Sequence, residues 1–124
     1  MAFSLRLVAA TQPEEVWKEM NRIGVSPEGL ELMIGKGEFI IVKVGNIPAP
    51  AASILKQEML AKGGEVALGK AMAYLGAEKG EAIIMGTRTQ YQRLVALLSR
   101  QPFDLSSLAQ DLRSLLATLE QGPP

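Results

Sequence analysis

The chain has 124 residues, of which 48% are apolar and 21% are charged, and these values are typical of one soluble globular domain. Thirteen basic residues balance thirteen acidic ones, which argues against a dedicated nucleic-acid or anionic-membrane surface. Cysteine and histidine are both missing, so disulfides, thiolate catalysis and the commonest metal ligand are excluded. Only two aspartates occur, Asp104 and Asp111, so a carboxylate-rich metal cage would have to use glutamates. We therefore expect no metal ligand and no catalytic residue in this chain.

The two ends of the chain bear on localisation and domain organisation. Residues Met1–Arg6 lack the basic start and long apolar stretch of a secretory signal, and no window reaches the roughly 18 apolar residues of a membrane span. The sequence therefore predicts a cytoplasmic protein. Gln121–Pro124 combines a helix stop with a stiff extended segment. We interpret residues 1–120 as a single α/β domain and residues 121–124 as the start of a linker to a missing C-terminal domain, although a frayed natural terminus fits equally well.

The N-terminal third predicts a strand followed by two helices. Alternating apolar residues indicate a first strand over Phe3–Ala9. Thr11 and Glu14 have the spacing of a capping box, which predicts a helix that ends at Gly24. A second, short helix is expected from Ser26 to about Gly35.

Two further strands are predicted, and both are expected to be buried. Glu38–Val44 contains four consecutive apolar residues, Phe39–Val42, and Glu81–Gly86 contains a similar run. Continuous apolar runs of this kind are typical of strands that are buried on both faces. We expect these two strands to be adjacent and parallel, because each leads directly into a helix.

The remaining segments read as helices. Ala51–Lys62 and Glu65–Leu75 are both predicted helical, although Glu65–Leu68 could hide another strand. A capping box at Thr89 and Gln92 predicts the next helix, and Leu105–Glu120 the last. The predicted fold is therefore α/β, with a small, mainly parallel sheet of three to four strands and about five to six helices packed on it.

The turns that follow the two best strands are the best candidate site. In open parallel sheets, ligands bind outside the carboxyl ends of the strands. Gly86, Thr87, Arg88 and Thr89 combine close backbone approach, two hydroxyls, a positive charge and a helix N-terminus, which suits an anion. Parallel strands would bring Asn46 to the same edge of the sheet as Thr87. The alternative is an ordinary N-cap turn, which uses the same residue types.

Two other patterns are weaker. Lys56 and Glu58 could serve acid–base chemistry, together with Arg88, in a small enzyme, but a solvated helix face explains them as well. The last helix carries a leucine seam with alternating steps of three and four residues. Its members are Leu105, Leu108, Leu112, Leu115 and Leu119, widened by Ala109 and Leu116. We expect the seam to pack on the sheet, with Leu116 and Leu119 reaching a partner or a following domain.

Four segments together resemble a known family. They are Lys56–Leu60 (KQEML), Gly63–Ala67 (GGEVA), Ile84–Thr87 (IMGT) and Gln101–Leu105 (QPFDL). In order and spacing they resemble the N-terminal extension that precedes the catalytic barrel in a subset of bacterial dihydropteroate synthases. This resemblance spans nearly the whole chain, and KQEML followed by two glycines is its most specific part.

The resemblance implies folate biosynthesis. Such enzymes condense a dihydropterin pyrophosphate with p-aminobenzoate on a TIM barrel, using Mg²⁺. The barrel's Asp-Ser-Phe-Ser loop is absent here, and 124 residues are about half of what such a barrel needs. No catalytic residue carries over, and no cofactor is expected in this chain, since Mg²⁺ is implied only for the parent enzyme's barrel.

The implied role is that of a non-catalytic accessory domain, acting in domain packing, oligomerisation or substrate shielding. Its expected partner is the C-terminal pterin-binding barrel of the same polypeptide. A homo-oligomer is left open, and neither nucleic acid nor membrane is expected. The alternative is a stand-alone module that binds a small ligand or an anion through the Gly86–Thr89 turn. A reading frame that continues into a barrel would favour the first interpretation.

Overall fold

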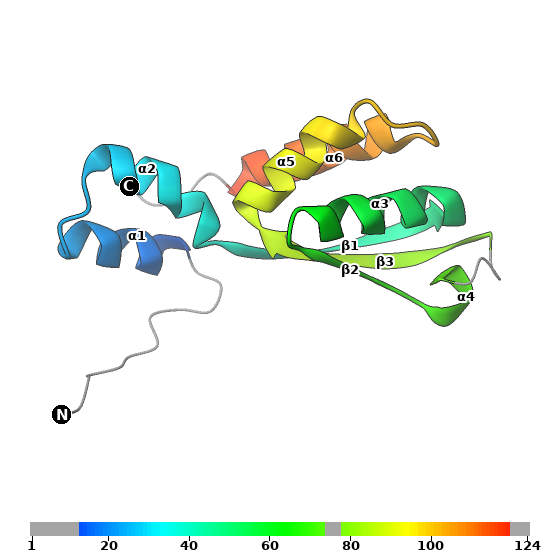
Figure 1. Cartoon of the computed structure of the whole chain (residues 1–124), viewed down its shortest axis with the longest axis horizontal. Helices are drawn as coiled ribbons and strands as arrows, with labels where there is room; N and C mark the ends of the chain where they lie inside the picture. The colour runs from blue at the N-terminus through cyan, green and yellow to red at the C-terminus, as the bar shows by residue number, and fades with distance from the viewer. Residues whose placement is uncertain (1–12, 74–77, 120–124) are drawn as a thin grey trace.

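The computed structural model describes residues 13–73 and 78–119, which form a three-stranded sheet with three helices on one side (Figure 1). The strands are β1 (Phe39–Pro48), β2 (Glu65–Leu68) and β3 (Lys79–Thr87). Three helices lie above the sheet in Figure 1: α3 (Ala49–Ala61), α5 (Arg88–Leu98) and α6 (Leu105–Leu119). Helices α1 (Pro13–Arg22) and α2 (Pro27–Met33) lie beyond the start of β1, connected to it by the short 3₁₀ helix η1 (Ile34–Lys36). A one-turn helix, α4 (Lys70–Ala73), follows β2.

The sheet is antiparallel, so the prediction of a mainly parallel sheet was wrong, whereas the α/β class was right. The strand order is β1-β3-β2, and β3 runs antiparallel to both neighbours. The cause is the segment expected to be one helix over Glu65–Leu75. Its first residues form β2 instead, and α4 is only four residues long. The connection from β2 to β3 is thus shorter than the dozen or so residues of a parallel crossover, and β3 returns antiparallel.

Several element boundaries also differ from the predicted ones. The capping box that begins α5 uses Thr87 and Gln90 rather than Thr89 and Gln92, so the helix begins earlier than expected. α2, α3 and α6 begin within two residues of their predicted starts. The expected strand at 3–9, the cap at Thr11 and the expected linker at 121–124 lie outside the described residues.

The core lies between the sheet and the three covering helices. Ile40, Val66 and Ile84 point from the three strands into it, and α3, α5 and α6 close it from above. Every inward residue predicted for the helix after β3 is buried, which confirms the helical spacing. These residues are Tyr91, Leu94, Val95 and Leu98. The Tyr91 hydroxyl lies 3.0 Å from the carbonyl oxygen of Ile40 and 2.9 Å from that of Ile84, so it links β1 to β3. Burial raises the pKa of this phenol, which keeps it protonated as a structural donor.

The opposite face of the sheet carries exposed apolar side chains, so the prediction that both strands are buried on two faces was wrong for this chain. We call this surface the open sheet face and define it by Phe39, Ile41, Ile83 and Met85. Phe39 is 41% exposed, Ile41 60% and Ile83 39%. Antiparallel sheets usually place polar side chains on a face that meets water. Apolar residues at these positions are therefore unusual.

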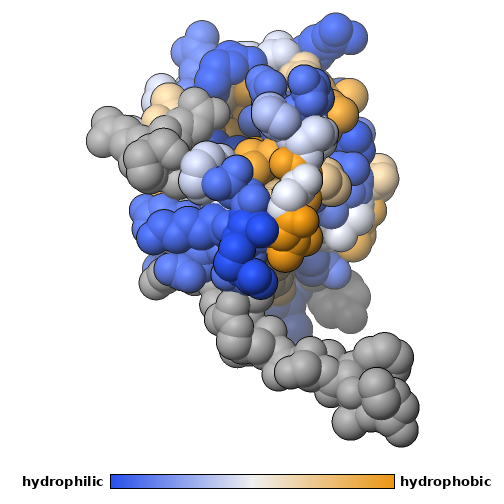
Figure 2. Space-filling model, turned by 90° about the vertical axis from the view of Figure 1, so that its left-hand side faces the viewer, coloured by the Kyte–Doolittle hydropathy of each residue, from blue (hydrophilic) through white to orange (hydrophobic). Residues whose placement is uncertain are grey.

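Helices α1 and α2 contribute little to the core. Ser26 caps α2, its hydroxyl accepting a hydrogen bond from the Gly29 amide at 3.1 Å. No residue of α2 is buried, and Ile23, after α1, is 68% exposed while Leu32 is 76% exposed. Figure 2 looks onto this end of the molecule and shows apolar atoms lying open between hydrophilic ones.

Candidate functional site

The turn between β3 and α5 is tightly closed by its own side chains. Thr87 is the N-cap of α5, and its hydroxyl accepts a hydrogen bond from the Gln90 amide at 3.3 Å. The Gln90 side chain in turn accepts one from the Thr87 amide at 2.8 Å. These bonds satisfy two of the amides that an anion at this helix N-terminus would use.

Arg88, the expected anion-binding charge, is engaged inside the domain. Its Nε lies 2.6 Å from one carboxylate oxygen of Glu38, and its Nη2 lies 3.1 Å from the other. Nη1 donates to the carbonyl oxygen of Leu116 near the end of α6, at 3.2 Å. Arg88 and Glu38 are 7% and 8% exposed, respectively. The guanidinium thus joins Glu38, the residue before β1, to α5 and α6, with a bidentate pair to the carboxylate.

The other predicted members of this site are either crowded or distant. A Cβ added at Gly86 would lie 2.4 Å from a methyl group of Met59 and 2.9 Å from the Gln90 side chain. One added at Gly35, in η1, would lie 2.7 Å from the Thr89 hydroxyl. The glycines therefore allow close packing of the turn rather than entry of a ligand.

Asn46 does not join the turn. Thr87 pairs with Phe39, at the opposite end of the β1–β3 ladder. Asn46 lies seven residues further along β1, which corresponds to roughly 20 Å. The expectation that the two residues share an edge was wrong, because it required parallel strands.

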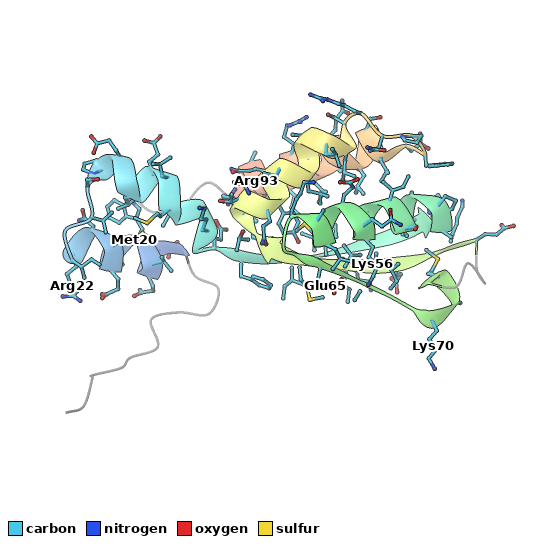
Figure 3. All side chains as sticks on the ribbon, in the orientation of Figure 1. Met20, Arg22, Lys56, Glu65, Lys70 and Arg93 are labelled. Carbon is cyan, nitrogen blue, oxygen red and sulfur yellow. The ribbon has the colours of Figure 1, made fainter. Side chains whose placement is uncertain are left out.

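Lys56 and Glu58 are also not brought together. The Lys56 ammonium donates to the Val66 carbonyl oxygen at 2.9 Å and lies 3.4 Å from Glu65. Figure 3 labels Lys56 on α3 and Glu65 on β2. Glu58 pairs instead with Lys62 at 3.4 Å. A backbone hydrogen bond from the Val66 amide lowers the pKa of Glu65. Lys56 thus joins α3 to β2 and forms no acid–base pair with Glu58.

Leu116 and Leu119, the expected interface residues, differ in their surroundings. Leu116 is 6% exposed and belongs to the core of this chain, because α6 packs against α5. Leu119 is 41% exposed. Of the two, only Leu119 exposes its side chain to solvent.

A concave surface at the other end of the sheet was missed as a site. It is a cleft of about 520 Å³ between the end of β1, the start of α3 and the start of α6. A β-bulge between Val44 and Ile47 opens one wall, and Asn46 within it has φ 54°. Phe103 and Asp104 form the other wall, with φ of 60° and 62°. We call it the bulge cleft.

The bulge cleft collects an uncommon set of residues. Every non-glycine residue with positive φ in the described part of the chain lines it. Left-handed backbone costs about 1–2 kcal/mol for such a residue and is enriched at functional sites. Both aspartates of the sequence, Asp104 and Asp111, line it together with Lys79. In the sequence, only the position of Asn46 after a predicted strand pointed to this cleft. No sequence pattern indicated that Asn46 lies beside the start of α6.

Within residues 13–73 and 78–119, no cluster of three or more acidic side chains could hold a metal ion. None of the helices in the same ranges combines the length and apolar character of a membrane-spanning segment.

Comparison with known proteins gives two relatives. Over 97 residues the chain is 37% identical to a probable bifunctional folylpolyglutamate synthase/dihydropteroate synthase of Halobacterium salinarum. Over 118 residues it is 26% identical to a bifunctional dihydropteroate synthase/dihydropteroate reductase of Helicobacter pylori. No family model matches the chain. No solved structure matches it significantly.

The matches cover most of this chain but little of the relatives. They span 78% and 95% of the chain, yet only 12% of the first relative and 31% of the second. The printed names of both relatives include dihydropteroate synthase as one of two activities. This chain is therefore similar to one part of two bifunctional, dihydropteroate synthase-containing proteins.

Proposed function

We propose that the chain is an accessory domain of a dihydropteroate synthase-type protein in folate biosynthesis, and that it docks with the pterin-binding barrel through the open sheet face. The observation that carries this proposal is the row of apolar side chains that residues 13–73 and 78–119 leave exposed. Ile41 is 60% exposed although it lies within a strand. Exposed apolar patches of this kind mark surfaces that another protein or domain covers.

The open sheet face has the layout of a docking surface. Ile41 on β1 pairs across the ladder with Met85 on β3. Ile83 lies on the same face of β3, two positions before Met85, and pairs with Lys43. The apolar side chains are therefore contiguous. An exposed ion pair between Lys43 and Glu81, 3.0 Å long, borders them. An apolar centre with a charged rim is the usual arrangement of a protein interface.

The lengths of the relatives favour the barrel as the occupant. The 118 aligned residues make up 31% of the H. pylori protein, so roughly 260 residues lie outside the match, about the size of one (β/α)₈ barrel. A second copy of this chain is the competing occupant, and it would appear as a concentration-dependent dimer.

We expect the isolated 124-residue chain to have no dihydropteroate synthase activity. The candidate charged residues are engaged in structural contacts, with Arg88 bound to Glu38 and Lys56 bound to Val66 and Glu65. The measurement is formation of dihydropteroate from a dihydropterin pyrophosphate and p-aminobenzoate by the pure chain. Turnover above a blank without protein would contradict the accessory role.

A second candidate function is a contribution to dihydropteroate reduction. The H. pylori relative is named for a reductase as well as a synthase, and this chain matches a part of it that leaves room for a complete barrel. By this reasoning the matched part is a candidate for the reductase half. Incubation of the chain with dihydropteroate and a reduced nicotinamide, followed by chromatography of the pterin products, tests it. Formation of tetrahydropteroate would replace the purely accessory role with this one.

A further inference from the structure

β1 and β2 are the two edge strands of the described sheet, and their outer edges differ. At β2, the backbone groups of Val66 that point away from β3 are both bound by side chains. Its carbonyl oxygen accepts a hydrogen bond from the Lys56 ammonium at 2.9 Å, and its amide donates to the Glu65 carboxylate at 2.8 Å. Charged side chains placed in this way keep a further strand from pairing with an edge.

The outer edge of β1 lacks such protection over its first half. The Arg88 amide donates to the Glu38 carbonyl oxygen at 2.9 Å, so Glu38 and every second residue after it bond toward β3. The intervening residues, Phe39, Ile41 and Lys43, therefore turn their backbone N–H and C=O groups outward. Among the described strands, only β3 pairs with β1. The β-bulge of β1 interrupts this edge only beyond these positions.

Helix α6 adds an apolar row next to this edge. The row consists of Leu108, Leu115 and Leu119, of which Leu115 is 38% and Leu119 41% exposed. Arg113 and Ala117 line a groove together with residues of α5, so the row lies on the side of α6 that faces away from α5. Leu108 lines the bulge cleft together with the end of β1, which places the start of the row beside this strand. We call the open edge and the leucine row together the edge surface.

We propose that the edge surface pairs with the same surface of a second copy of this chain. Two β1 strands related by a two-fold axis at Ile41 run antiparallel, and all three outward residues of each strand then face a residue of the other. Ile41 lies opposite Ile41 of the second copy, and Phe39 lies opposite Lys43 of the second copy. These three pairs exchange about six backbone hydrogen bonds, two for each pair.

This register is self-complementary in charge and shape. No like charges face each other, because each Lys43 lies opposite an aromatic ring, which attracts an ammonium. Gly37 and Gly45 form the next pair on either side and add no side chain that could clash. The axis is perpendicular to the sheet, so both α6 helices lie on the same side of the joined sheet and their leucine rows face each other. The open sheet face stays uncovered, so this inference does not depend on the docking proposed above.

The test is sedimentation velocity of the 124-residue chain over a range of concentrations, for which we expect a reversible dimer. Lys43→Pro removes an outward N–H and no bond to β3, and proline is tolerated at such an edge position. It should raise the dimer dissociation constant about ten- to a hundredfold, since two hydrogen bonds per dimer are lost. Lys43→Gln keeps the N–H and is the matched control. A parent chain that stays monomeric up to about 1 mM would overturn the proposal.

A second pair of variants tests the helix side of the edge surface without changing the strand. Leu115→Glu places a charge in the leucine row and should dissociate the dimer, while circular dichroism of the monomer stays that of the parent. Gln110→Glu, at an exposed position on another side of α6, is its control and should leave the dimer intact. An equally strong dimer in Leu115→Glu and in Lys43→Pro would overturn the proposal.

The outcome is distinguishable from other pairings and from the proposed function. Ile83→Glu lies on the open sheet face but on β3, so it should leave an edge dimer intact. A dimer that Ile83→Glu dissociates and Lys43→Pro does not would place the contact on the open sheet face and overturn the edge pairing. A monomer whose Ile41 amide resists hydrogen exchange would mean that the same chain covers its own edge, and it would also overturn the pairing. Neither result affects the accessory role, which depends on the barrel.

Discussion

Replacing Arg88 by methionine is expected to lower the free energy of unfolding by about 3–5 kcal/mol. The change removes both bonds to Glu38 and the bond to the Leu116 carbonyl oxygen, and it leaves the Glu38 carboxylate buried without its cation. Domains of this kind are stabilised by about 5–15 kcal/mol in total, so the loss would be a large fraction of the whole.

Chemical denaturation of Arg88→Met, with two comparison variants, checks this prediction. Removing both charges with Glu38→Met and Arg88→Met should recover most of the stability, because no uncompensated charge remains buried. Arg22→Met is the exposed control, since Arg22 pairs with Glu19 at the surface and should change stability little. An Arg88→Met protein as stable as the parent would show that the pair does not tie the three elements together.

Leu112→Ala is expected to destabilise the domain by about 2–5 kcal/mol through the cavity that it leaves. Leu112 is 2% exposed and lies at the middle of the leucine seam of α6. Leu115→Ala on the same helix is the matched control, because Leu115 is 38% exposed and its truncation opens no comparable cavity.

Thermal unfolding and light scattering on both variants separate packing from association. We expect Leu112→Ala to lower the Tm and to leave the molecular mass unchanged. An unchanged Tm for Leu112→Ala would mean that this side of α6 does not pack in the core. Leu119→Ala, at the exposed end of the seam, should leave the Tm close to that of the parent.

The helices and their buried faces could be predicted from local sequence. Apolar residues at helical spacing identified the inward side of α5, and the leucine seam identified α6 with its buried Leu105 and Leu112. These signals are local, since each depends on residues a few positions apart. The capping box of α5 was misplaced because Thr87 and Thr89 both stand three residues before a glutamine.

The direction of the strands could not be predicted in the same way. It depends on whether Glu65–Leu68 is a strand, and a four-residue segment with a single buried side chain, Val66, carries a weak signal. The apolar run Phe39–Val42 predicts a strand that is buried on two faces, although the described residues cover only one. The prediction of burial on both faces is therefore wrong for this chain by itself. It would agree with a sheet whose second face is covered by another domain.

The two candidate sites differ in the same way, since one is local in the sequence and the other is not. Gly86–Thr89 was predicted as an anion site from its residue types, which suit a helix cap equally well. In the structure, Thr87 caps α5 and Arg88 pairs with Glu38. The bulge cleft joins Asn46 to Phe103 and Asp104, which are more than fifty positions away. Only the fold brings such residues together.

The most direct test of the central claim is to tag this sequence in its native chromosome, purify the tagged polypeptide and assay dihydropteroate synthesis, with and without Ile41→Glu. The accessory role predicts an active polypeptide that contains a barrel. In that polypeptide, Ile41→Glu should separate this domain from the barrel or lower the stability of the polypeptide. Leu60→Glu, at a 46% exposed position on α3, is the control and should have no such effect. An inactive tagged polypeptide without a barrel, or one in which Ile41→Glu changes nothing, would contradict the account.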